Sequence, residues 1–130
     1  MANNTDFTNT VGPTQAGSAP SAAAGRITFP ATSITAADYV VVTCGFTPRY
    51  VQWMNVTGVV AAEWFEGMAA DTCIKTAAAG TRTLETTNKG ITICDSDGTA
   101  NTAGNSFKVS QNATLVAILA SQICNWRAIG

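Results

Sequence analysis

Residues 39 to 57 carry the strongest β-strand signal of the chain and read Tyr-Val-Val-Val-Thr-Cys-Gly-Phe-Thr-Pro-Arg-Tyr-Val-Gln-Trp-Met-Asn-Val-Thr. Two runs rich in β-branched and aromatic residues flank a short Gly-Phe-Thr-Pro break, and this composition predicts two paired strands joined by a tight connection. Pro48 has no N–H to give to a strand ladder, so it belongs in the turn. Both faces of the runs are partly apolar, so we expect this hairpin at the centre of the domain.

Outside this stretch, short apolar runs alternate with turn residues. Strands are expected at residues 26–29, 61–65, 73–76, 81–86, 91–94, 107–109 and 123–129. Residues 112–120 are ambiguous, because Leu115, Val116 and Leu119 have helical spacing in a short segment. About eight short strands, with no amphipathic helices alternating between them, predict an all-β fold, a small β-sandwich or jelly-roll-like domain.

The chain of 130 residues is expected to form one domain with an extended arm. Residues 1–25 are mostly Asn, Thr, Gly, Pro, Ser and Ala, and Phe7 and Val11 are their only sizeable apolar side chains. Such a segment cannot bury enough surface to order by itself. It is either a disordered tail or an N-terminal arm that orders against a neighbouring subunit, and residues 26–130 form the β domain.

Charged residues make up only 12% of the chain, about half the share of a typical soluble domain, and the net charge is −1. This balance does not direct the protein toward nucleic acid or an anionic membrane. A sparsely charged surface indicates a protein that binds a partner, although a neutral, Thr-rich β surface without a partner has the same composition. No 18-residue apolar stretch and no secretory signal are present, which predicts synthesis in a cytoplasm.

The sequence offers little catalytic chemistry. It has no histidine and no phosphate-binding glycine motif. Glu63 and Glu66 resemble a glycosidase pair, but three residues along a strand places them on opposite faces. The cysteines at 44, 73, 94 and 124 lack the close spacing of a zinc site and are expected to be buried free thiols. We therefore predict no enzyme, no cofactor and no metal.

Interface anchors are the remaining signal, since Trp and Arg are the residue types that dominate binding energy at interfaces. Trp53 is expected in the core, whereas Trp64 and Trp126 are open to either role. Arg49 and Arg127 lie beside aromatic residues in two strand regions. The candidate residues for a capsid or subunit interface are Phe7, Val11, Arg49, Trp64, Trp126 and Arg127.

Several short motifs resemble a known family, the small structural proteins of tailed bacteriophages. The similarity covers about residues 38 to 129, and its motifs are Gly-Phe-Thr-Pro-Arg-Tyr-Val (45–51), Asn-Val-Thr (55–57), Glu-Trp-Phe-Glu-Gly-Met (63–68), Gly-Thr-Arg-Thr (80–83), Gly-Ile-Thr (90–92), Phe-Lys-Val (107–109) and Asn-Trp-Arg-Ala (125–128). The resemblance implies a virion component, a head decoration or cement protein that binds the major capsid protein on the outer shell. It implies no catalytic residues, and a trimer at a symmetric junction is expected. The cysteines, the arm and the segment from Leu115 to Leu119 depart from the family pattern.

Two other readings stay open. One is a tail, fibre or spike module that binds a host surface glycan or another tail protein, with Trp64, Trp126 or another exposed aromatic residue in contact with the glycan. The other is an enzyme, which a pocket with converging Glu66, Asp71 or Lys75 would support.

Overall fold

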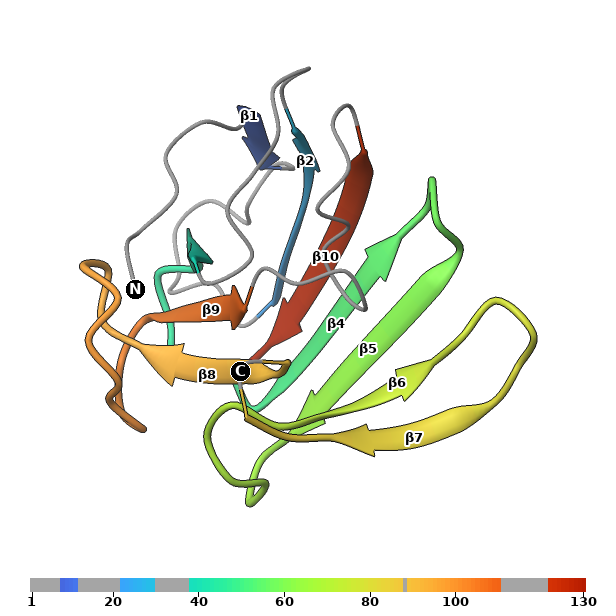
Figure 1. Cartoon of the computed structure of the whole chain (residues 1–130). Helices are drawn as coiled ribbons and strands as arrows, with labels where there is room; N and C mark the ends of the chain where they lie inside the picture. Colours follow the sequence, from blue (N-terminus) through green and yellow to red (C-terminus); the bar gives the residue numbers. More distant parts are fainter. Residues whose placement is uncertain (1–7, 12–21, 30–37, 88, 111–121) are drawn as a thin grey trace.

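The computed structural model describes residues 8–11, 22–29, 38–87, 89–110 and 122–130. Within these residues the protein is all-β, and ten antiparallel strands form two sheets, consistent with a small β-sandwich (Figure 1). The large sheet consists of β1 (Thr8–Val11), β2 (Ala22–Thr28), β10 (Ile123–Ile129), β4 (Tyr50–Asn55), β5 (Val60–Phe65), β6 (Cys73–Thr76) and β7 (Arg82–Glu85), in that spatial order. The small sheet consists of β3 (Tyr39–Thr43), β9 (Ser106–Ser110) and β8 (Ile91–Cys94). The predicted all-β class is confirmed.

The predicted hairpin at residues 39 to 57 is wrong. β3 pairs with β9 in the small sheet, whereas β4 pairs with β10 and β5 in the large sheet. The Gly-Phe-Thr-Pro break carries the chain from one sheet to the other and includes Gly45 with φ of 86°. Each run buries one apolar face, and two such faces are buried equally well across a core as side by side. Composition and alternation are the same in both arrangements, so they do not distinguish them.

Three aromatic side chains form the centre of the core between the sheets. Trp53 of β4 lies directly opposite Trp126 of β10, and Phe107 of β9 meets both edge-on, with ring centroids 6.5 Å and 5.7 Å away. Small residues flank the two tryptophans, Gly25 beside Trp126 and Ala62 beside Trp53. This alternation of large and small side chains lets the facing sheets interdigitate at native density.

Residues 95–105 pair with the edge of β8 and fold over part of the outer face of the small sheet. Asn101 N–H donates to the carbonyl of Ile93, and Lys108 Nζ donates to the carbonyl of Gly98 at 2.8 Å. Gly98 packs so closely on the Tyr39 ring that a Cβ would overlap it. As a result Thr92 and Ser106, which face away from the core, are also buried.

A backbone crossing joins the two sheets where the chain enters β6 and β8. The carboxylate of Asp71 accepts hydrogen bonds from the N–H of Gly90 at 3.1 Å and from Ser110 Oγ at 2.9 Å. Ile91 N–H donates to the carbonyl of Thr72. Gly90 is required here, because a Cβ at this position would overlap the Asp71 backbone. The crossing fixes the small sheet over the core.

The other predicted strands all occur, with ends shifted by a few residues. β2 begins at Ala22, so it starts within the stretch expected to form the arm. The ambiguous segment 112–120 lies outside the described residues. Among the residues described, no helix is long and apolar enough to cross a membrane.

Candidate functional site: the outer face of the large sheet

The large sheet turns one face toward the core and the other away from it, and we call the second the outer face. Strand register places on it Ala22, Ala24, Arg26, Asn125, Arg127, Ile129, Tyr50, Gln52, Met54, Ala61, Glu63, Phe65, Ile74, Thr76, Arg82 and Leu84. Unlike the small sheet, it has no covering loop among the described residues. Phe65, Leu84 and Ile129 are 43%, 65% and 41% exposed. The outer face is therefore the main accessible apolar surface of the described part of the chain.

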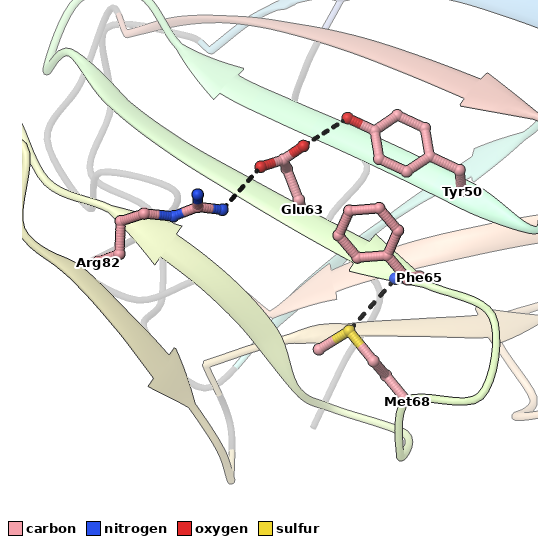
Figure 2. Close-up of polar contacts among 5 residues, drawn as sticks. All are labelled: Tyr50, Glu63, Phe65, Met68 and Arg82. Carbon is pink, nitrogen blue, oxygen red and sulfur yellow. Dashed lines mark hydrogen bonds and ion pairs between the residues drawn. The ribbon is translucent and has the colours of Figure 1, made fainter.

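An aromatic pair lies at one end of this face. Tyr50 of β4 and Phe65 of β5 are cross-strand partners, with ring centroids 5.1 Å apart and a 53° tilt. The N–H of Phe65 donates to Met68 Sδ at 3.2 Å, which ties the following turn to the strand (Figure 2). Ile129 pairs with Tyr50 on the other side and extends the apolar row toward β2. These side chains form an apolar platform at this end of the outer face.

A polar network lies next to this platform. Tyr50 Oη donates to Glu63 Oε2 at 2.7 Å, and Arg82 Nη2 donates to Glu63 Oε1 at 3.3 Å (Figure 2). Partial burial and the hydrogen bond to Glu63 raise the pKa of Tyr50, and Arg127 on the neighbouring strand opposes that rise. The Glu63 carboxylate is thus satisfied within the sheet and keeps the tyrosine ring in place. The network positions side chains and provides no free nucleophile.

An exposed ion pair marks the rim where β4 begins and β5 ends. Arg49 donates two hydrogen bonds to Glu66, Nε to Oε2 and Nη2 to Oε1, both at 2.9 Å. Hydrogen bonding to Arg49 lowers the pKa of Glu66. The backbone N–H of Glu66 also donates to the carbonyl of Arg49, so the pair closes the end of the β4–β5 ladder.

The structure places the predicted interface residues in different parts of the molecule. Trp126 and Trp64 point into the core and are 3% and 7% exposed, so neither contributes to the outer face. Arg127 lies on the outer face and Arg49 at its rim. Phe7 lies outside the described residues, and Val11 belongs to β1, whose side chains are not described. The two tryptophans were predicted as interface residues because of their residue type. Tyr50 and Phe65 were not predicted, although strand alternation places them on the opposite face from the tryptophans.

The three residues named for an enzyme pocket, Glu66, Asp71 and Lys75, have separate partners. Glu66 pairs with Arg49, Lys75 pairs with Glu85 at 3.1 Å, and Asp71 holds the crossing between the sheets. A hollow of about 160 Å³ beside Trp64 is lined by Met68, Ala70, Ile93 and other side chains without an ionisable group. An adjoining hollow of about 170 Å³ includes Asp71 and Lys108, whose hydrogen bonds are given above.

The four cysteines are free and buried, as predicted. Burial raises the pKa of the thiols of Cys44, Cys73 and Cys124 to about 12 and that of Cys94 to about 11. Thiols with such pKa values carry almost no thiolate near neutral pH and act as small core residues. No group of three or more His, Cys, Asp or Glu side chains in the described residues is arranged to hold a metal ion.

Comparisons with known proteins add no relative: no protein-family model, no curated protein and no solved structure matches this chain.

Proposed function

We propose that this protein is a non-enzymatic structural protein of a bacteriophage virion, a decoration protein that binds the major capsid protein on the outer shell. Its motifs resemble those of small phage structural proteins. The observation that carries the proposal is the outer face of the large sheet, over which none of the described residues folds. The proposal concerns adhesion alone, with no reaction and no cofactor.

The outer face carries several of the residue types that are enriched at protein interfaces. Aromatic residues, Met and Arg are enriched at such interfaces and Lys is depleted. The face carries Tyr50, Phe65, Met54 and arginines at 26, 82 and 127, and none of the three lysines of the chain lies on it. A sheet face with exposed apolar side chains can lie against a shell and exclude water around its aromatic pair.

The mechanism would be additive binding energy. Each copy that bridges neighbouring capsid subunits stabilises the assembled shell relative to the separated subunits, and many copies together raise the free energy of rupture. A trimer at a symmetric junction would place several outer faces against the shell at once, which strengthens binding through effective concentration. An N-terminal arm that orders on a sister copy or on the shell would add to this avidity.

The test is co-sedimentation of the purified protein with capsids of the phage that encodes it, followed by electron microscopy of the decorated particle. We expect saturable binding, density on the capsid lattice and the outer face turned toward the shell. Arg127→Glu should weaken binding at least tenfold, which corresponds to about 1.4 kcal/mol. A protein absent from purified particles, or bound with the outer face turned to solvent, would contradict the proposal.

The pair of half-buried Tyr50 and exposed Phe65 also favours the second candidate, a tail, fibre or spike module that binds a host glycan, because sugar rings stack on accessible aromatic rings. The same reconstruction separates the two functions. Density at the tail, together with binding to host surface glycans that Phe65→Ala abolishes, would replace capsid decoration with glycan binding.

A further inference from the structure

Two arginines lie side by side at the β2 end of the outer face. The register of β10 and β2 places Asn125 opposite Arg26 and Arg127 opposite Ala24. Arg26 and Arg127 are therefore diagonal cross-strand neighbours on the same face, with Cα atoms roughly 7–8 Å apart. Both side chains are exposed. Two guanidinium groups are thus held on rigid strands at a separation that one short segment can span.

A shallow hollow lies beside these arginines. It has a volume of about 240 Å³ and is lined by Ala22, Ala23, Ala24 and Arg127. Ala22 and Ala24 bring only methyl side chains to this face and Ala23 turns its methyl group into the core, so the floor of the hollow stays low while Arg127 forms its wall. We call this region, with Arg26, the arginine hollow. It continues into the apolar row of Ile129, Tyr50 and Phe65 through the pairing of Ala22 with Ile129.

Neither arginine of the hollow forms a direct ion pair within the described residues, and the Tyr50 hydroxyl, which bonds to Glu63, also lies beside Arg127. Of the four arginines, Arg49 pairs with Glu66 and Arg82 with Glu63. No carboxylate of the described residues lies within ion-pair distance of Arg26 or Arg127, and the polar neighbour of Arg127 is the Tyr50 hydroxyl. In a chain with net charge −1, this leaves a local positive site on an otherwise sparsely charged face.

We propose that the arginine hollow binds the carboxylates of an acidic polypeptide segment of the partner, an inference that rests on the proposed docking role of the outer face. A guanidinium group forms paired hydrogen bonds with a carboxylate, and two guanidinium groups select a segment with two carboxylates. The alanine floor admits the backbone of that segment, and the adjacent apolar row receives its uncharged side chains. Charge complementarity then fixes orientation, while the aromatic platform supplies most of the buried area.

The same features argue against a nucleic acid as the occupant. Binding to a phosphate backbone relies on many Lys and Arg contacts along a strand. Within the described ranges two arginines form no direct ion pair, and the Glu63 carboxylate lies on the same face, joined to Arg127 through the Tyr50 hydroxyl. An acidic peptide needs only the two local charges.

The test is a titration of the full chain, followed by NMR of the arginine Nε–Hε groups and the backbone amides. The probes are a capped peptide of alternating glutamate and alanine, a matched peptide of alternating glutamine and alanine, and a thymidine oligonucleotide. We expect the glutamate peptide to shift the Arg26 and Arg127 signals but not that of Arg49, and the glutamine peptide to shift none. Arg26→Gln and Arg127→Gln should each weaken peptide binding at least fivefold, whereas Lys89→Gln, with the same charge change in a loop, should leave it unchanged.

Equal shifts with the glutamine peptide, no shifts with the glutamate peptide, or larger shifts with the oligonucleotide would each overturn the inference. Capsid co-sedimentation separates it from the proposed function. If capsids bind the wild type and both arginine variants equally, decoration stands and the arginine hollow fails as a recognition site. If the glutamate peptide binds at the arginine hollow and capsids do not bind the protein, the carboxylate site stands and the decoration role fails.

Discussion

The inner and outer faces of the large sheet are built by alternate residues of the same strands, yet they differ sharply. The inner face carries Trp53, Trp64 and Trp126, all buried. The outer face carries Tyr50 and Phe65 within reach of solvent, next to hydrogen-bonded charges. Both faces are rich in aromatic residues, so hydrophobicity alone does not distinguish them. What distinguishes them is the small sheet, which covers one face and leaves the other open.

Aromatic residues on the inner face contribute to folding, and those on the outer face are available to contribute to binding. A buried aromatic ring leaves water when the chain folds, so its transfer free energy contributes to folding. An exposed ring leaves water only when a partner binds, so its transfer free energy contributes to binding. Substitutions of one residue type on the two faces should therefore affect different quantities. Those on the inner face change the free energy of unfolding, and those on the outer face change association.

The largest effect is expected for Phe107→Ala. Phe107 is fully buried and meets both Trp53 and Trp126, so its loss leaves a cavity in the centre of the core. The substitution should lower the free energy of unfolding by about 3–5 kcal/mol. Urea unfolding followed by tryptophan fluorescence measures it. A loss of less than about 1 kcal/mol would contradict the central role of this ring.

Gly90→Ala is expected to cause the next largest loss in the free energy of unfolding. Gly90 lies in the backbone crossing that holds the small sheet over the inner face of the large sheet. A Cβ at residue 90 overlaps the backbone of Asp71, and the chain must shift to admit it. We expect a loss of about 2–4 kcal/mol, measured by the same unfolding experiment. Gly58→Ala is the matched control, since a Cβ there makes only ordinary contact with the Asn55 side chain. Equal stability of the two variants would contradict the tight crossing.

Substitution of Glu85 tests the contribution of an ion pair on the inner face at the β7 edge. Its carboxylate pairs with Lys75, and this hydrogen bond lowers the Glu85 pKa below the ordinary 4.5. The folded state therefore binds protons less readily than the unfolded chain, so the contribution of Glu85 is present above pH 4.5 and is lost as the pH falls through its folded pKa. Glu85→Gln should cost about 1 kcal/mol near neutral pH and progressively less below pH 4.5. A difference from the wild type that does not vary with pH would contradict the ion pair as its source.

Phe65→Ala is the outer-face counterpart of Phe107→Ala and should affect stability least. Phe65 is 43% exposed and packs mainly on Tyr50, so we expect a loss of no more than about 1 kcal/mol in the free energy of unfolding. Capsid binding should weaken about tenfold or more, measured by co-sedimentation. A variant that loses several kcal/mol of stability, or that binds capsids normally, would remove the contrast between the two faces.

The sequence predicted much of the fold from local patterns. Period-two alternation identified β8 and β10 with their full bounds and separated Cys124, Trp126 and Ala128 from Asn125 and Arg127. Alternation did not say which of these sets faces the core. It also did not say that β3 and β4 belong to different sheets, because pairing partners far apart in sequence leave no mark on either strand.

The candidate surface was predicted only in part. Arg127 and Arg49 were found from their residue type and their aromatic neighbours. Tyr50 and Phe65 were missed because an aromatic residue in a strand reads the same whether it is buried or exposed. Their partners Glu63 and Arg82 lie on separate strands, and only the registers of β5, β6 and β7 bring them together.

The sequence by itself determined an all-β chain with buried thiols and few charges, because strand propensity, alternation and residue composition act locally. The tertiary structure was needed to establish which side of the large sheet the small sheet covers and which arginines form ion pairs with Glu63 and Glu66. Both depend on how strands distant in sequence pair and on what covers each face, and the free energy of that packing is a property of the whole assembly of strands.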